Sequence, residues 1–171
     1  EIYLRFLSQI GMPIVQPLID QGRLVKVQSE TGAAIEYLSA LSMWIDNIHN
    51  WQSTEGYKIR VNAGTTLDIT AAPIDLPLAI PLASGWNIIG YPVPTSQNAM
   101  AALSDLIAAG SLVKVQSETG AAIEYIPALS MWIDNIGNFL PGEGYKVRVN
   151  TSTVLNMDGA DKALTSALNR S

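Results

Sequence analysis

Cysteine is absent from this 171-residue chain, which excludes disulfides, a thiol nucleophile and cysteine-ligated metal sites. Charged side chains are scarce, at 15% of the residues, against about a quarter in a typical soluble protein. The chain also lacks a run of about 18 apolar residues, so it is not expected to span a membrane as a helix. The net charge is −5, and the ten basic residues stand singly or as Lys-x-Arg pairs. Nucleic acid is therefore not expected as a partner, because binding phosphates requires clustered Lys and Arg.

A signal peptide is also missing, and the chain begins at Glu1 rather than at Met. We interpret the sequence as a mature or excised segment, which leaves room for a removed leader. A surface that is poor in charge and rich in hydroxyl and amide groups is more typical of extracellular proteins than of cytosolic enzymes. The expected location is therefore secreted or on the cell surface.

An internal repeat is the main feature that the sequence does contain. Residues 24–67 and 112–155 align without a gap at an offset of 88, and 33 of these 44 positions are identical. Residues 1–23 match residues 89–111 at 7 of 23 positions at the same offset. We predict copy 1 at residues 1–70, a Pro- and Ala-rich linker at 71–84, copy 2 at 85–158 and a tail at 159–171 that could be helical. The residues equivalent to 86–88 would precede residue 1, so copy 1 lacks its own first strand: either this strand was cut off or another segment supplies it.

Each copy is predicted to begin with a strand and an amphipathic helix. In copy 2 the strand covers residues 86–93, Ser96 is the expected helix N-cap, and Gly110 follows the helix C-terminus. Copy 1 has Pro13 and Pro17 in the matching stretch, so its helix should be shorter or irregular.

A β-hairpin is the firmest local prediction in both copies. The triplet Glu-Thr-Gly at 30–32 and 118–120 fits a three-residue turn with Gly in the left-handed position. This turn sets Lys26 opposite Glu36 in copy 1, and in copy 2 Lys114 opposite Glu124, Val115 opposite Ile123 and Val113 opposite Tyr125. Further strands are expected at 145–150 and 153–157. The predicted fold class is α+β, mainly antiparallel β: a tandem duplicated strand-helix-β-meander module with pseudo-twofold symmetry.

A catalytic site is not predicted. The repeated Glu-Thr-Gly triplets are placed like the paired loops of aspartic proteases, but the acid is Glu and a turn is the favoured interpretation. The only histidine, His49, is matched by Gly137 in copy 2 and is interpreted as a solvated turn residue. We expect neither catalytic residues nor a metal or cofactor. An enzyme would require Glu36 and Glu124 to meet in a pocket on the pseudo-twofold axis.

Repeated acids and aromatic residues are the candidates for ligand binding. Asp46 and Asp134, the latter near Asn138, could contribute oxygens to calcium, although turn hydrogen bonds are the favoured role. Trp44, Trp132 and Trp51 lie in or near loops, where they could stack on sugars; a role in the core is favoured for these rings. The candidate set is therefore Trp44, Trp51, Trp132, Asp46, Asp134 and Asn138.

The strings GWNIIGYPV, LVKVQSETGAAIEY, IDNIGNFLPGEGYKVRVN and TVLNM between residues 85 and 157 resemble a repeat of secreted, surface-associated proteins of Bacteroidetes and relatives. Copy 1 matches from Leu24 on, with His49 at a Gly position and Thr54 at another. The resemblance implies an exported, multidomain and adhesion-like context, often upstream of a type IX sorting domain. It implies no catalytic residues.

The expected function is a non-enzymatic extracellular module for adhesion, spacing or protein–protein interaction. The alternative is a carbohydrate-binding module that uses the loop tryptophans, and an enzyme is the third hypothesis. We also predict pairing with a second chain, because an open sheet edge in copy 1 would invite an added strand.

Overall fold

The computed structural model describes residues 2–4, 9–69 and 74–159, which form a β-rich fold with few helices. The strand pairs recorded in this part of the chain are antiparallel, in agreement with the predicted class. The helices are α1 (Gly11–Asp20), α2 (Ala99–Ala102) and α3 (Ser104–Ala108), with a 3-10 turn η1 at Pro127–Leu129. The strands are β1 (Ile2–Leu4), β2 (Gln9–Ile10), β3 (Leu24–Gln28), β4 (Ala34–Leu38), β5 (Met43–Asp46), β6 (Asn50–Trp51), β7 (Tyr57–Val61), β8 (Leu78–Leu82), β9 (Gly85–Gly90), β10 (Gln97–Asn98), β11 (Leu112–Ser117), β12 (Ala122–Ile126), β13 (Met131–Asp134), β14 (Asn138–Phe139), β15 (Gly144–Val149) and β16 (Thr153–Met157).

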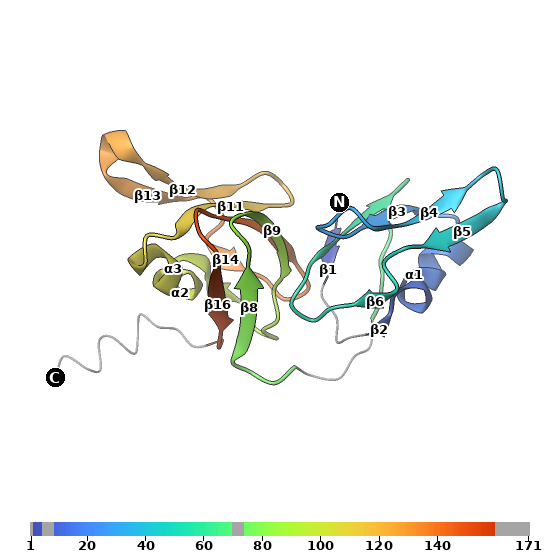
Figure 1. The fold of residues 1–171 in the computed structure, drawn as a ribbon, viewed down its shortest axis with the longest axis horizontal. Helices are drawn as coiled ribbons and strands as arrows, with labels where there is room; N and C mark the ends of the chain where they lie inside the picture. Colours follow the sequence, from blue (N-terminus) through green and yellow to red (C-terminus); the bar gives the residue numbers. More distant parts are fainter. Residues whose placement is uncertain (1, 5–8, 70–73, 160–171) are drawn as a thin grey trace.

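Two five-stranded sheets organise the chain, in the orders β1-β7-β3-β4-β5 and β13-β12-β11-β15-β9. Helix α1 lies against one face of the first sheet, and α2 and α3 lie against one face of the second (Figure 1). Short two-stranded pairs join β2 with β6, β10 with β14 and β8 with β16. We call the sheet face that points away from these helices the outer face.

The repeated hairpins have the predicted register. Lys26 pairs with Glu36 and Lys114 with Glu124, and each pair also forms a salt bridge on the outer face. Their turn glycines, at 32 and 120, both have φ of +91°, a left-handed conformation that glycine adopts without a steric penalty. The structure differs at Val113. A register shift between Leu112 and Lys114 turns Leu112 into the core and leaves Val113 exposed.

The helices contradict the prediction that Pro13 and Pro17 make the helix of copy 1 shorter or irregular. Helix α1 runs without interruption for 10 residues with Pro17 inside it, whereas the second half has two short helices, α2 and α3. Pro13 lies in the first turn of α1, where a backbone N–H has no helical partner to lose. The buried side chains of Val15 and Leu18 hold the rest of α1 on the first sheet.

The helix ends in the second half are partly as predicted. The N-cap of α2 is Asn98 rather than Ser96, since the Asn98 side chain accepts a hydrogen bond of 2.9 Å from the backbone N–H of Ala101. Gly110 follows α3 with φ of +64°, as its place after the helix predicts.

The segment 71–84 is more than a linker. Within it, β8 pairs with β16 along five residues, and Ile80 and Leu82 are buried in the core of the second half. Residues 160–171 of the predicted tail lie outside the described residues.

The strand position beside β7 that the sequence leaves empty is occupied. β1 pairs with β7 through three residues, with Ile2 opposite Ile59. In the second half the longer β9 fills this position, with Asn87 opposite Val147. The edge on which the predicted strand addition depended is therefore covered, and the outermost strands of the two sheets are β1, β5, β13 and β9.

Two apolar clusters form the core, one in each half. Trp51 is 0% exposed and stacks on Tyr57 with a centroid distance of 4.4 Å. Phe139 packs in the same way against Tyr145 at 4.3 Å. Trp51 is therefore a core residue in this structure, and its ring offers no face to a ligand.

In the part of the chain that the structure describes, none of the helices has both the length and the apolar character needed to cross a bilayer.

Candidate functional site

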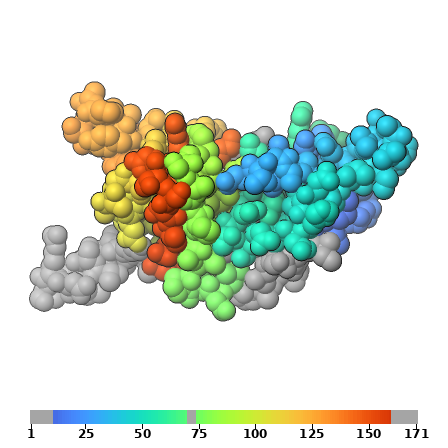
Figure 2. All heavy atoms as spheres, viewed as in Figure 1, coloured from blue at the N-terminus to red at the C-terminus, as the bar shows by residue number. Residues whose placement is uncertain are grey.

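The ends of the β4–β5 and β12–β13 hairpins concentrate exposed apolar side chains. We call residues 37–44 and 125–132 the arms. Leu41 and Leu129, at the arm tips, are 60% and 61% exposed. The exposed large apolar residues on the arms are Tyr37, Leu38, Leu41, Met43, Tyr125, Leu129 and Met131, which are seven of the thirteen in the described residues. The arms stand at opposite ends of the molecule, the β12–β13 arm in orange and the β4–β5 arm in blue to cyan (Figure 2).

Each arm carries apolar groups on both faces of its hairpin. Tyr37 pairs across the hairpin with Trp44, on the same sheet face as the buried Ile35, while Leu38 pairs with Met43 on the outer face. The Tyr37 and Trp44 rings meet edge-on, with centroids 5.8 Å apart and planes at 64°. Tyr125 and Trp132 repeat this contact at 5.7 Å and 60°. The half-buried tryptophans join the arms to the core, and the tyrosines remain exposed.

The acidic residues predicted as candidates for ligand binding accept hydrogen bonds within turns. One carboxylate oxygen of Asp46 accepts hydrogen bonds from the backbone N–H groups of Ile48 and His49, at 2.9 and 2.8 Å. One carboxylate oxygen of Asp134 likewise accepts from the backbone N–H groups of Ile136 and Gly137, at 2.9 and 2.8 Å. Asn138 is exposed on β14 and lines a cavity of about 270 Å³ with Glu143 and Tyr145. The structure thus separates these polar residues from the exposed part of the arms.

The acids that an enzyme would require do not meet. Glu36 is bonded to Lys26 at 3.1 Å, and Glu124 to Lys114 at 2.9 Å, on two different sheets. Within residues 2–4, 9–69 and 74–159, no group of three or more His, Asp or Glu side chains is arranged to hold a metal ion.

A contact between the halves joins the first hairpin to the edge of the second sheet. The Glu30 carboxylate accepts a hydrogen bond of 2.6 Å from the backbone N–H of Ile88, and the Gly56 N–H donates to the Ile88 carbonyl at 2.7 Å. A Cβ atom on Gly56 would lie 2.8 Å from the Ile88 side chain, so only glycine permits this approach. Burial raises the pKa of the Glu30 carboxyl, the bond from Ile88 opposes this shift, and the nearby Glu55 adds to it. We call this contact the junction.

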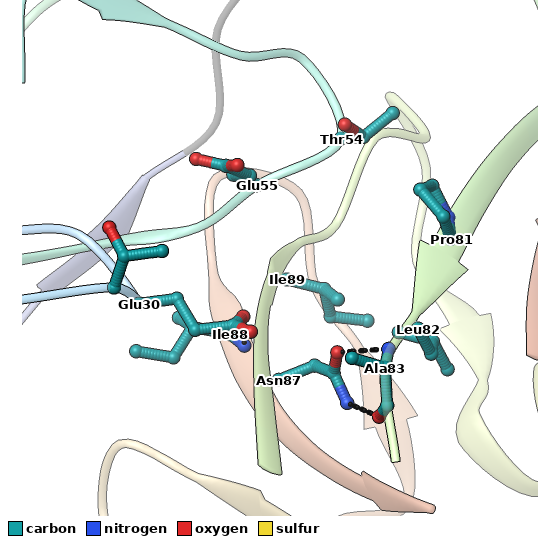
Figure 3. Close-up of a pocket in the computed structure, with 10 residues that line it drawn as sticks. Glu30, Thr54, Glu55, Pro81, Leu82, Ala83, Asn87, Ile88 and Ile89 are labelled. Carbon is teal, nitrogen blue, oxygen red and sulfur yellow. Dashed lines mark hydrogen bonds between the residues drawn. The ribbon is translucent and has the colours of Figure 1, made fainter. Parts of the chain in front are cut away.

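Cavities lie on two sides of the junction, and Glu30 and Ile88 line both. The first has about 340 Å³ and receives Glu55 and Thr54 from the first half, as Figure 3 shows. Its opposite wall includes Asn87, whose amide is bonded to both backbone groups of Ala83 at 2.8 and 2.9 Å. These bonds hold the start of β9 against the end of β8.

The second cavity, of about 400 Å³, opens on the outer faces. It is lined by Glu30, Lys58, Trp86, Ile88, Gln116 and Lys146. Gln116, Lys146 and Ile88 form one row across β11, β15 and β9, and Lys114, Arg148 and Trp86 form the next row. The Arg148 guanidinium carbon lies 6.0 Å from the centre of the Trp86 ring, which is a cation–π distance.

Basic residues gather on the two outer faces. Of the seven Lys and Arg in the described residues, six occupy outer-face positions in the strand registers: Lys26, Lys58, Arg60, Lys114, Lys146 and Arg148. The outer faces are thus basic in a chain whose net charge is −5.

Comparison with known proteins gives no relative: no family model matches the chain, and neither the curated proteins nor the solved structures include a match.

The sequence identified part of these surfaces. Trp44 and Trp132 mark the arms, but the exposed aliphatic residues at the tips were not singled out. Trp86 was also missed, because it has no counterpart in copy 1. The Lys-x-Arg pairs at 58–60 and 146–148 were visible, and strand alternation places both members of each pair on one face.

Proposed function

We propose that this chain is a non-enzymatic interaction module whose two arms bind a protein partner. The observation that carries the proposal is the concentration of exposed apolar side chains on the arms. Exposed apolar patches on a folded domain are typical of interaction surfaces. Both arms present the same tyrosine, leucine and methionine, so a partner with two equivalent sites would engage both arms at once.

The proposal includes the origin and location of the module. We infer a tandem duplication of one strand-helix-meander unit, with the two copies related by pseudo-twofold symmetry. Its support is the 33 identities in 44 positions, the matching hairpin registers and the placement of the arms at opposite ends. The low charge and the resemblance to surface-protein repeats support a secreted or cell-surface location.

Photo-crosslinking from the arm tips tests this function. A benzoylphenylalanine at Leu41 or at Leu129 should trap the same protein from the native extracellular fraction. Excess unlabelled chain should abolish the product, whereas a chain with Leu41→Ser and Leu129→Ser should not compete. The matched control places the crosslinker at Val154, an exposed apolar residue on β16, and should give no such product. Equal trapping from all three positions would contradict the proposal.

A second copy of the chain is one candidate partner. The outermost strands β5 and β13 end each sheet at an arm, and edge strands offer unpaired backbone groups. Light scattering would then show a dimer in the wild type and a monomer in the Leu41→Ser, Leu129→Ser variant.

Carbohydrate binding by the arms is the second candidate function. It is favoured by the exposed Tyr37 and Tyr125 rings beside Trp44 and Trp132. The edge-on geometry leaves single ring faces rather than a flat platform. A glycan array on which Tyr37→Ala and Tyr125→Ala remove binding would support this function.

A further inference from the structure

We propose that the outer cavity at the junction binds a carboxylated sugar of the uronic acid type. This site is distinct from the arms, and its residues come from both halves of the chain. Its lining combines an indole ring, two ammonium groups, an amide and a carboxylate. Each of these groups matches a different part of an acidic pyranose.

The Trp86 ring supplies the apolar surface. It is 43% exposed although it is large and apolar, and it borders the cavity. The C–H face of a pyranose packs on such a ring, and burying that face removes apolar area from water. The Arg148 guanidinium carbon lies 6.0 Å from the centre of this ring, so a cation–π contact adds to the packing of the indole beside the cavity.

Two lysines supply the charge that selects an acid. Lys58 comes from β7 of the first sheet and Lys146 from β15 of the second, and both line the cavity. They occupy equivalent positions in the repeat, 88 residues apart. A carboxylate between them would form charge-assisted hydrogen bonds, which are about twice as strong as neutral ones. The other basic residues on the outer faces add a favourable long-range field.

The remaining polar groups recognise hydroxyls. Gln116 lies next to Lys146 in the register of β11 and β15, and its amide can both donate and accept. Glu30 faces the same cavity with an oxygen-rich group that accepts from sugar hydroxyls. Its negative charge orients the ligand, because the carboxylate of the bound sugar must lie at the lysine end.

Titration of the full chain with tri-galacturonic acid tests the site, with tryptophan fluorescence and calorimetry as readouts. We expect saturable binding by the acid and none by the trisaccharide whose carboxyls have been reduced to alcohols. Lys58→Gln and Lys146→Gln should each weaken binding about tenfold, the equivalent of ~1.4 kcal/mol. Trp86→Ala should remove the fluorescence change.

The matched control is Arg60→Gln, which removes one positive charge from the same outer face but does not line the cavity. It should change the affinity less than about twofold, because a screened surface charge contributes little. Equal binding of the reduced trisaccharide, equal losses for Arg60 and Lys58, or complete competition by inorganic sulfate would each overturn the proposal. The Leu41→Ser, Leu129→Ser variant should bind the sugar normally, so failure here is distinguishable from failure of the arms.

Discussion

The first and second halves of the chain share 33 of 44 aligned residues, yet the same residues have different surroundings. Glu30 accepts a hydrogen bond from the other half, whereas its equivalent, Glu118, lines a cavity within the second half. The second core also contains β8 and β16, and the residues equivalent to β16, at 65–69, do not form a strand. Turns of identical sequence therefore make different contacts, depending on whether a sheet edge of the other half lies beside them.

The differing positions show a further pattern, in which changes in size compensate one another. In the first half the bulky Trp51 packs on Gly11, and in the second half the equivalent positions hold Phe139 and Ala99, both buried in one apolar cluster. A Cβ on Gly11 would lie 1.9 Å from the indole nitrogen of Trp51. The larger indole is thus combined with glycine and the smaller phenyl ring with alanine, so that both cores remain filled.

Exchanging these pairs is the strongest test of the comparison. Gly11→Ala should destabilise the chain by about 1–3 kcal/mol, because the buried indole leaves no room for a methyl group. Adding Trp51→Phe should recover much of this loss, since the first half would then carry the pair found in the second. Urea denaturation of the two single variants and the double variant measures the coupling.

The reverse exchange supplies the control. Phe139→Trp should destabilise the second half, and Ala99→Gly should partly rescue it. Additive effects in both cycles would mean that the two pairs do not compensate.

Local sequence predicted much of this fold. The hairpin registers follow from the glycine at 32 or 120 together with the alternation of Val27 and Ile35, because turn chemistry and strand facing agree. The strand at 153–157 is also predicted, but its partner β8 lies in the segment predicted as a linker, because Pro77 and Pro81 are more typical of a linker than of a strand.

The candidate sites were less predictable. Whether a ring is buried depends on what packs over it, so Trp44 and Trp51 looked alike in the sequence although only Trp51 is fully buried. The outer cavity requires Lys58 and Lys146 to be brought together by the junction, which is a tertiary contact. No local sequence pattern indicates which sheet edge Glu30 contacts in the folded chain.

Truncating the Glu30 side chain tests how much the junction between the halves stabilises the fold. Glu30→Ala leaves the buried Ile88 N–H without its acceptor and should cost about 1–2 kcal/mol in the free energy of unfolding. Glu30→Gln retains an acceptor and removes a partly desolvated charge, so it should be close to neutral or stabilising. The pKa of this carboxyl is raised in the fold, so its ionisation opposes folding as pH rises through the shifted pKa. Urea denaturation measures both variants, and a Glu30→Ala chain as stable as the wild type would argue against the junction.

Substitutions at His49 and at its counterpart Gly137 should change the stability of the chain in opposite directions. His49 has φ of +61°, a conformation that glycine tolerates better, and Gly137 has φ of +77° at the equivalent position. His49→Gly should therefore stabilise the chain by about 0.5–1 kcal/mol, and Gly137→His should destabilise it by a similar amount. Thermal unfolding measures both, and a loss of stability in His49→Gly would show that the imidazole contributes to folding.

The smallest effect near neutral pH is expected from Tyr57 and Tyr145, which are members of the two aromatic stacks. Tyr57 accepts from the Gln52 N–H at 2.8 Å and donates to Glu55 at 3.1 Å, and Tyr145 makes the equivalent bonds to Leu140 and Glu143. Tyr57→Phe should cost about 0.5 kcal/mol, because water replaces part of these bonds.

Alkaline pH should enlarge this small effect and reveal its cause. Burial raises the pKa of Tyr57 from 10.0 to about 12, and it also raises the pKa of Tyr145. Between pH 10 and 12 the unfolded chain therefore releases the Tyr57 proton while the folded chain retains it, so stability is complete below pH 10 and falls as pH rises. Tyr57→Phe should make this fall shallower, since the variant has no hydroxyl proton at this position to release on unfolding. An unchanged slope in urea denaturation across this range would show that the Tyr57 hydroxyl ionises as freely in the folded chain as in the unfolded one.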